Sequence, residues 1–188
     1  MDILIITGPP YSGKGTQCEI LKKQLNYGHI STGDRCRVEK NNQTEIGKIL
    51  SEYEEKGNLV PDSIIKDLFE KIIDENIEEK AIILDGYPRT IPQVKDLIDL
   101  TTTKGLKIKK VINISVPHFE LLNRAKYRAK TSTRLDDSNI KIQEKRIKVF
   151  EEFTLPAINF MNSELDFVEI DGLGSIEETN EIIIENLN

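Results

Sequence analysis

The chain has 188 residues, of which 38% are hydrophobic and 31% charged, and its net charge is −6. This length is typical of one domain, and the composition is too apolar for a disordered chain. The acidic balance argues against a general nucleic-acid-binding protein, whose surface would carry an excess of Lys and Arg. Any phosphate chemistry in this chain must therefore depend on local clusters of basic residues.

The cysteines and the N-terminal segment indicate a cytoplasmic protein. Cys18 and Cys36 show neither metal-ligand spacing nor a disulfide framework, which favours a reducing compartment. The first apolar run is too short for a signal peptide. No segment approaches the ~20 apolar residues that cross a bilayer, so we expect no membrane partner.

Strand and helix patterns alternate along the chain. The predicted strands, of which the second is the weakest, are 3–7, 28–31, 81–85, 111–116 and 167–170. The predicted helices are 13–25, 61–74, 91–100, 117–130, 139–162 and 175–187. Most of the strands are nearly continuous in Ile, Leu and Val, as in a parallel sheet covered on both faces. We therefore predict an α/β fold, a doubly wound parallel five-stranded sheet with helices on both faces.

Two polar stretches, 33–60 and 131–139, are surplus to this sheet. Insertions on α/β sheets commonly lie over the carboxyl ends of the strands, where ligands bind. Both stretches are therefore candidate lids.

The strongest motif is GPPYSGKGTQ at 8–17, directly after the first strand and at the start of a helix. The pattern Gly-x4-Gly-Lys in this context predicts a P-loop, whose backbone N–H groups bind phosphate. Lys14 would reach the β- and γ-phosphates. Gly15 occupies the usual hydroxyl position, so Thr16 is the expected Mg²⁺ ligand. A glycine-rich turn with a chance lysine is the alternative.

Other P-loop classes fit less well. An Asn-Lys-x-Asp motif for guanine is absent from the sequence, and the strand at 81–85 continues as LDGYPR. Gly86 follows Asp85 where a hydrolytic ATPase carries an acid to orient water. Transfer of the phosphoryl group to another acceptor is favoured.

Five motifs in order resemble those of the adenylate kinases: GPPYSGKGTQ (8–17), HISTGDRCR (29–37), GNLVPD (57–62), LDGYPRTIPQ (84–93) and RAKTSTRLDD (128–137). The likeness spans nearly the whole chain. It implies one P-loop domain, 1–188, with a nucleoside-monophosphate-binding insertion at about 31–60 and a short lid at about 128–139. It also implies the reaction ATP + AMP ⇌ 2 ADP with Mg²⁺ by a monomer. UMP-CMP kinases share most of these motifs.

The resemblance assigns residues to two nucleotides and a metal. ATP-side residues are Tyr11, Ser12, Gly13, Lys14, Gly15, Thr16, Arg124, Arg128 and Gly174. AMP-side residues are Thr32, Arg37, Asn58, Leu59, Val60, Gly86, Tyr87, Pro88, Arg89, Gln93, Arg134 and Arg146. The implied catalytic set is Lys14, Arg37, Arg89, Arg124, Arg128, Arg134 and Arg146. The implied Mg²⁺ ligands are Thr16 with Asp34 and Asp85, the two carboxylates acting through water.

The scarcity of arginine supports these assignments. The chain has 19 Lys and only 7 Arg, and six of the arginines fall on phosphate-binding positions of the family. Two nucleotides bring many negative charges together, and the Arg fork binds phosphate in a way that Lys cannot. Three alternatives stay open: Arg124 could be a structural ion pair, Asp34 a helix cap, and Lys145 could replace Arg146.

The acceptor needs separate argument. Thr32, Asp34 and Gln93 follow the adenylate kinase pattern, whereas UMP-CMP kinases tend to Ala, Glu and Asn at these positions. The Gln93 amide matches the adenine edge, but cytosine has the same pattern and a flipped amide suits uracil. A UMP-CMP kinase is thus the first alternative. A silent nucleotide sensor is the second, although the intact Lys14 and Asp85 argue against it.

Some positions depart from the family pattern. Tyr11 and Thr133 stand where Gly is common, and the spacing from Arg134 to Arg146 is one residue longer than expected. The short lid lacks a cysteine cluster, so we expect no structural zinc. The attacking group is an already ionised phosphate oxygen. Neither His29 nor His118 therefore needs a catalytic role.

Overall fold

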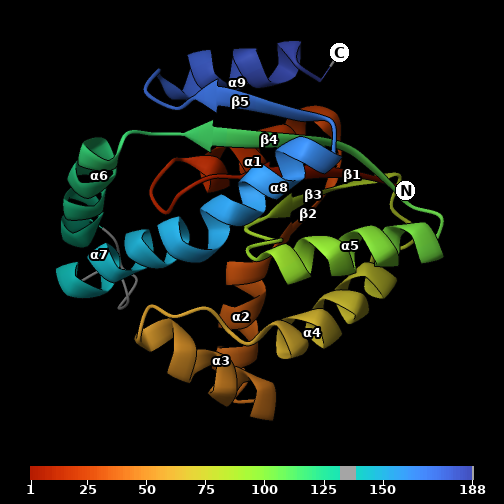
Figure 1. Ribbon diagram of the computed structural model, residues 1–188, viewed down its shortest axis with the longest axis horizontal. Helices are drawn as coiled ribbons and strands as arrows, with labels where there is room; N and C mark the ends of the chain where they lie inside the picture. The colour runs from red at the N-terminus through yellow and green to blue at the C-terminus, as the bar shows by residue number, and fades with distance from the viewer. Residues whose placement is uncertain (132–138, 188) are drawn as a thin grey trace.

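The computed structural model describes residues 1–131 and 139–187, and its centre is a five-stranded parallel sheet (Figure 1). The strand order is β2-β3-β1-β4-β5. The strands are β1 (Asp2–Thr7), β2 (Gly28–Ser31), β3 (Ala81–Asp85), β4 (Lys107–Ser115) and β5 (Phe167–Asp171). All strand pairs are parallel. The predicted sheet is confirmed, including its weakest strand, β2.

Nine helices are described around the sheet within residues 1–131 and 139–187. They are α1 (Lys14–Leu25), α2 (Thr32–Asn41), α3 (Glu45–Glu55), α4 (Asp62–Glu75), α5 (Ile91–Thr103), α6 (His118–Thr131), α7 (Ile140–Val149), α8 (Leu155–Glu164) and α9 (Ile176–Glu185). Among these described helices, none is both long and apolar enough to cross a bilayer.

Alternate side chains of the strands fill two cores. Leu4 and Ile6 of β1 face α1 and α9, whereas Ile3 and Ile5 face α4, α5 and α8. Successive side chains of a strand point to opposite faces, so an unbroken apolar strand supplies both cores. In Figure 1, α5 and α8 cross in front of the sheet and α1 lies behind it. All the carboxyl ends of the strands consequently meet at one edge.

The helix predicted at 139–162 is interrupted by a π-helical turn, Phe150–Thr154. Pro156, in the first turn of α8, has no backbone N–H to donate. The Leu155 N–H donates to the Phe150 carbonyl, five residues earlier, which is the π-helical spacing. The periodic apolar pattern continues across this turn and therefore does not reveal it.

The polar stretch after β2 forms α2 and α3, which extend away from the sheet (Figure 1). Ser31 caps α2, because its Oγ accepts the N–H of Asp34 at 3.3 Å. Gly47 lets the two helices approach closely, since a Cβ at this position would lie 2.1 Å from the Glu39 carbonyl oxygen. Leu50 is the fully buried apolar side chain of α3. Leu50 and Cys36 join these helices to the larger core, with Ile46 and Tyr53 packed against it.

Candidate active site

A cleft of about 730 Å³ opens at the carboxyl ends of β1, β2 and β3. The predicted site residues that line it are Tyr11, Gly13, Lys14, Gly15, Thr16, Asp34, Arg37, Asn58, Leu59, Asp85, Gly86, Pro88, Arg89, Arg128 and Arg146. The predicted residues that do not line it are Ser12, Thr32, Val60, Tyr87, Gln93, Arg124 and Gly174. Arg134 lies outside the described residues.

The loop between β1 and α1 wraps the N-terminus of the helix. Gly8 has φ +146°, and a Cβ there would lie 2.5 Å from the Ile114 carbonyl oxygen, so only glycine fits. Gly13, with φ +92°, precedes the first helical residue. The loop's backbone N–H groups and the helix N-terminus favour a bound anion.

Lys14 bends back over this loop, with Nζ 3.3 Å from the Pro9 carbonyl oxygen. Burial lowers the pKa of Lys14, while the nearby Asp85 carboxylate opposes that shift. A buried ammonium group beside an anion-binding loop is suited to a negatively charged ligand, which would supply the counter-charge that water cannot.

Arg124 supports the loop from behind the cleft. Its Nη1 donates to the Ser12 carbonyl at 3.3 Å and its Nη2 to the Gly172 carbonyl at 2.8 Å. Its Nε donates to Glu120 one helical turn earlier, at 2.9 Å. Arg124 itself does not line the cleft. Arg124 therefore tethers α6 to the P-loop.

Tyr11 takes the place of a loop glycine at the cost of backbone strain. Its φ is +70°, a region that disfavours residues with a side chain by ~1–2 kcal/mol. The ring packs beside Val116 and Leu121, and the Arg128 guanidinium lies 5.8 Å from its centroid. Packing and a cation–π contact thus oppose the strain and place Arg128 at the cleft.

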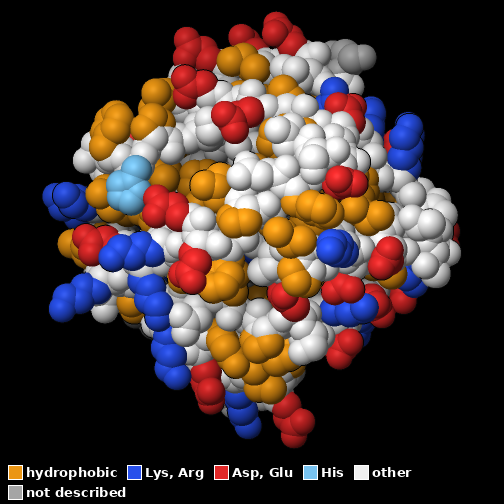
Figure 2. All heavy atoms as spheres, in the orientation of Figure 1, with side chains coloured by type: hydrophobic (Ala, Val, Ile, Leu, Met, Phe, Trp, Pro, Cys, Tyr) orange, Lys and Arg blue, Asp and Glu red, His pale blue; other side chains and the backbone are white. Residues whose placement is uncertain are grey.

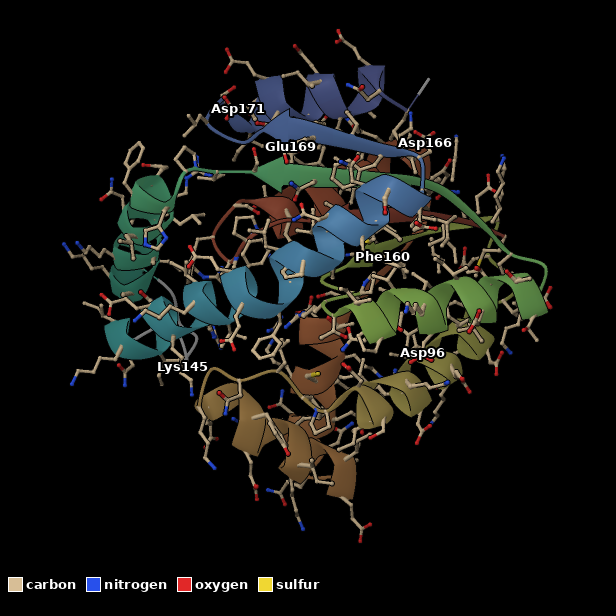
Figure 3. All side chains as sticks on the ribbon, viewed as in Figure 1. Asp96, Lys145, Phe160, Asp166, Glu169 and Asp171 are labelled. Carbon is tan, nitrogen blue, oxygen red and sulfur yellow. The ribbon has the colours of Figure 1, made fainter. Side chains whose placement is uncertain are left out.

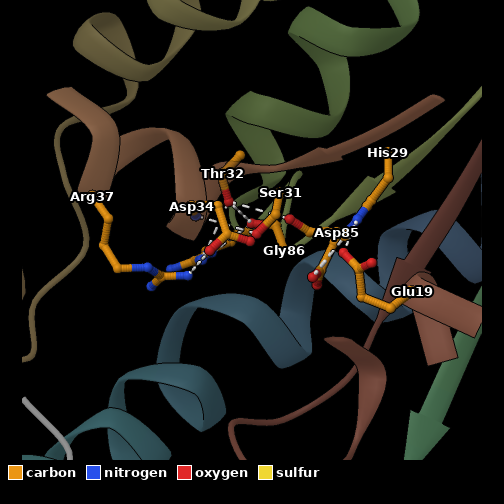
Figure 4. Close-up of polar contacts among 9 residues, drawn as sticks. Glu19, His29, Ser31, Thr32, Asp34, Arg37, Asp85 and Gly86 are labelled. Atoms are coloured by element: carbon orange, nitrogen blue, oxygen red, sulfur yellow. Dashed lines mark hydrogen bonds and ion pairs between the residues drawn. The ribbon is translucent and has the colours of Figure 1, made fainter. Parts of the chain in front are cut away.

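Asp85 ends β3 at the floor of the cleft, beside His29 of β2 (Figure 4). His29 Nε2 lies 3.6 Å from Asp85 Oδ2, and its Nδ1 lies 3.0 Å from Glu19 Oε1. Burial alone would raise the pKa of Asp85, but His29 and Lys14 outweigh it and lower the pKa. Burial likewise opposes protonation of His29, yet the two carboxylates raise its pKa. Asp85 is therefore ionised at neutral pH.

Arginines from two elements line the opposite wall. Arg37 pairs with Asp34 one turn earlier in α2 (Figure 4). Arg89 Nε donates to the Gly86 carbonyl at 2.6 Å, and its Nη2 approaches Thr32 Oγ1 at 3.4 Å. Thr32 also donates to the Gly86 carbonyl at 2.9 Å. Because Ser31 is the N-cap, Asp34 is a first-turn residue and not the cap of α2.

Gln93 lies beneath this wall, with 3% of its surface exposed. Its Oε1 accepts the Arg89 N–H at 2.8 Å, and its Nε2 donates to Asp62 Oδ1 at 2.7 Å. Asp62 also accepts from Thr90 Oγ1 at 2.9 Å. A carboxylate only accepts and a backbone N–H only donates, so these neighbours determine which end of the amide carries oxygen. Tyr87 is buried beside this network and stacks on Phe69 at 3.9 Å.

Helices α6 and α7 bring further cations to the cleft. Arg128 and Arg146 line it, whereas Lys145 is exposed on α7 and does not (Figure 3). Of the two alternatives at this position, Arg146 is the one at the cleft. Figure 2 shows Lys and Arg gathered over the α6–α7 side and acidic side chains over α9. Other Lys and Arg are scattered over the same face, so the cluster beside the cleft is a local one.

Some cleft residues were not expected from the sequence. They include Glu19, His29, Gly57, Phe150 and Thr154. His29 begins the segment HISTGDRCR, and Glu19 follows shortly after the P-loop motif. The two side chains meet only because α1 packs across β2. Phe150 and Thr154 face the cleft from the π-helical turn, for which the apolar pattern carries no signal.

These features define a class of protein. A P-loop, an ionised carboxylate at the end of a neighbouring strand, and arginines from α2, the loop after β3, α6 and α7 converge on one cleft. This is the arrangement of a kinase that works by positioning phosphates and neutralising their charge. The protein is a P-loop nucleoside monophosphate kinase.

Comparisons with known proteins identify the family. The profile of the family "Adenylate kinase" matches residues 6–165. The chain is 40% identical to the adenylate kinase of Parabacteroides distasonis over 185 residues, 98% of this chain and 97% of that one. It is 41% identical to that of Porphyromonas gingivalis over 175 residues, with 93% and 90% covered. The adenylate kinase of Flavobacterium psychrophilum is 33% identical over 185 residues, with 98% and 97% covered. The chain belongs to the adenylate kinase family.

Proposed function

We propose that this protein transfers the terminal phosphoryl group of ATP to AMP, reversibly giving two ADP. The observation that carries the proposal is the single cleft in which Lys14 of the P-loop faces Arg37, Arg89, Arg128 and Arg146. A single nucleotide on the P-loop would not need arginines on the opposite wall. Cations on both walls suit two phosphate chains that meet between them.

In this scheme the protein acts mainly by placing charge. The AMP phosphate is largely ionised at neutral pH, so no side chain has to remove a proton from it. Lys14 and the P-loop hold the donor, while Arg37 and Arg89 hold the acceptor. Arg128 and Arg146 screen the group in transfer. Mutual alignment and charge neutralisation lower the barrier of phosphoryl transfer.

The floor of the cleft fits a magnesium ion. Thr16 and Asp85 both line it, and a Cβ on Gly15 would lie 3.6 Å from Asp85 Oδ2, so the loop backbone can approach the carboxylate. Mg²⁺ takes oxygen ligands from one or two carboxylates, phosphates and several waters. Thr16 with Asp34 and Asp85, the two carboxylates acting through water, are the proposed holders. Bound with ATP, the ion neutralises charge on the phosphate oxygens.

The Asp62–Gln93 contact supports AMP as the acceptor. The amide keeps one N–H of Nε2 and one lone pair of Oε1 beyond its contacts with Asp62 and Arg89. That donor and acceptor match the adenine edge. Uracil would need the amide reversed, and the reversed amide would place NH₂ against the Arg89 N–H and oxygen against the Asp62 carboxylate. Cytosine, by contrast, shares the adenine pattern and is rejected mainly by size.

A turnover assay with ATP and each of AMP, CMP, UMP, GMP and dTMP tests the proposal. We expect AMP to be preferred and CMP to be the best wrong substrate, with discrimination of about 10²-fold from shape. Equal use of CMP or UMP would instead indicate a UMP-CMP kinase. Tight ATP binding without turnover of any acceptor would indicate a nucleotide sensor.

Two variants distinguish recognition of the acceptor's nucleobase by Gln93 from a purely structural role of Gln93 beneath the cleft wall. Gln93→Ala should lower kcat/KM for AMP more than for CMP and barely change KM for ATP, because adenine loses its partner. Asp62→Ala frees the Gln93 amide to reverse, so kcat/KM for UMP should rise relative to kcat/KM for AMP. Equal losses for all three nucleotides in both variants would contradict the assignment of base recognition to Gln93.

The organisation around the cleft completes the proposal. Segments 31–60 and about 128–139 would act as the monophosphate-binding insertion and the lid of a single domain, although most of the latter lies outside the described residues. One chain supplies both walls of the cleft, which supports a monomer. The thiols of Cys18 and Cys36 form no disulfide, in keeping with the cytoplasm.

A further inference from the structure

A thiol, an imidazole and a carboxylate meet where α1 crosses the ends of β2 and β3. Cys18, His29 and Asp85 each place a ligand atom within 4.8 Å of the other two. Cys18 is fully buried in the core beneath α1, and the His29 side chain is 5% exposed. His29 and Asp85 line the cleft, so the cluster is reached from the nucleotide side.

The imidazole is oriented with one nitrogen toward this cluster. Nδ1 lies 3.0 Å from Glu19 Oε1, and since a carboxylate only accepts, the proton of the neutral ring belongs on Nδ1. Nε2 then carries the lone pair. It is buried, has no hydrogen-bond partner, and points toward Asp85 at 3.6 Å (Figure 4). A lone pair facing a carboxylate is unfavourable, so this nitrogen needs either a proton or a metal ion between it and Asp85.

We propose that Cys18 Sγ, His29 Nε2 and an Asp85 oxygen form a binding site for a zinc-class divalent cation at the floor of the cleft. Three atoms within 4.8 Å of one another can all be about 2.8 Å from a common point. Shifts of roughly half an ångström would bring them to the ~2.0–2.3 Å of Zn–N, Zn–O and Zn–S bonds. Glu19 is the outer carboxylate that orients a ligating histidine in many zinc sites.

The donor set distinguishes this site from the proposed magnesium site. Thiolate sulfur and imidazole nitrogen favour zinc-like ions, whereas Mg²⁺ prefers oxygen. Binding breaks the Cys18 S–H bond, forms the metal–sulfur bond and releases the proton to solvent. Lys14 and Arg89 act electrostatically on Asp85 and oppose a cation there, so in the absence of nucleotide phosphates the gain from sulfur binding is what retains the ion. A fourth position toward the cleft is left for water.

Cobalt(II) added alone to the nucleotide-free protein tests the site, because a thiolate ligand gives it a near-ultraviolet charge-transfer band. We expect the band to saturate at one equivalent in the wild type and in Cys36→Ser, the control for the second buried thiol. Cys18→Ser should lose it, and Cys18→Ala provides a second variant should serine disturb the core; circular dichroism checks that each is folded. No wild-type band, or a band that persists in both Cys18 variants, would overturn the proposal.

The histidine and its outer carboxylate give a graded test. Glu19→Gln should weaken Zn²⁺ binding ~10–100-fold, as the loss of an outer hydrogen-bond partner does in other zinc sites. His29→Gln removes a ligand and should weaken Zn²⁺ binding at least as much. Competition with a chromophoric chelator measures both without turnover. Unchanged affinity in the two variants would contradict the assigned ligands.

A functional consequence rests on the proposed function. Zn²⁺ bound at Asp85 would remove that carboxylate from the proposed Mg²⁺ site, so micromolar Zn²⁺ should inhibit wild-type phosphoryl transfer and spare Cys18→Ser. Equal inhibition of both proteins would contradict this consequence. The cobalt measurement uses no substrate, so it stands or fails separately from the kinase assignment.

Discussion

The two sides of the cleft are built in different ways. On the floor, Lys14 follows the P-loop and Asp85 ends β3, and neighbouring groups hold both side chains. On the rim, Arg37 belongs to α2. Its ion-pair partner, Asp34, has a side chain that is 60% exposed. The floor can therefore bind phosphate with little rearrangement, while the rim can move with its helices. A kinase needs both properties, because it must align phosphates and also exclude water.

The largest effect should come from the floor. Lys14→Ala removes the ammonium group that faces the phosphates, and we expect kcat to fall about 10²–10³-fold, as for loss of a similar electrostatic contact elsewhere. The fold should persist, since within residues 1–131 and 139–187 the Lys14 side chain donates one hydrogen bond, to the Pro9 carbonyl. Steady-state kinetics and thermal melting measure the two quantities. Near-normal kcat with an unchanged melting temperature would refute the role of Lys14.

Hydrogen exchange compares the two sides directly. Amides of α2 and α3 should exchange by local opening and slow about 100-fold with a bisubstrate analogue at 100 times its Kd. Such an analogue joins two adenosines by a phosphate chain. Amides near the C-terminal end of α9, remote from the cleft, provide the internal control. Equal exchange of α2 and α3 with and without the analogue would contradict a moving rim.

Gly47→Ala should disturb the rim and leave the floor intact. The added Cβ would lie 2.1 Å from the Glu39 carbonyl oxygen and so push α3 away from α2. Overpacking costs ~1–3 kcal/mol, so we expect KM for AMP to rise about tenfold with KM for ATP unchanged. Gly105→Ala is the matched control: it adds strain at φ +65° with no atom within 4 Å of the new Cβ. A similar rise in KM for AMP in the control would show a general effect.

The smallest effect should lie outside the cleft, at the capping box of α9. Ser175→Ala removes the N-cap hydroxyl and should cost ~1 kcal/mol, or about 2–4 °C in Tm, without changing kcat. The Ser175 N–H lowers the pKa of Glu178, so this carboxylate stabilises the fold above its unfolded pKa. That contribution is lost as pH falls through the lower folded value. The Tm difference between wild type and Glu178→Gln should therefore be present at pH 7 and vanish at acidic pH.

The sequence predicted most of the fold because most strands are marked by short runs of apolar residues. Residues 81–85 form a strand with the bounds expected from the apolar run, and 28–31 do so despite its brevity. β4 begins at Lys107, earlier than the 111 predicted, because residues 107–110 pair with β1 although they are Lys except for Ile108 and so lack an apolar run. The break at Phe150–Thr154 was not predicted, since the missing N–H of Pro156 leaves the apolar periodicity unchanged.

For the site, the sequence alone determined which chemistry is available, because a P-loop needs its Gly and Lys spacing and phosphate binding needs arginine. The tertiary structure decided how each group is used. Arg124 is directed to the Ser12 and Gly172 carbonyls behind the loop, and Gln93 is oriented by Asp62 from another helix. The approach of Cys18 to His29 likewise depends on how α1 packs across β2. Such pairings join residues far apart in the chain, and only the packed sheet and helices bring them within bonding distance.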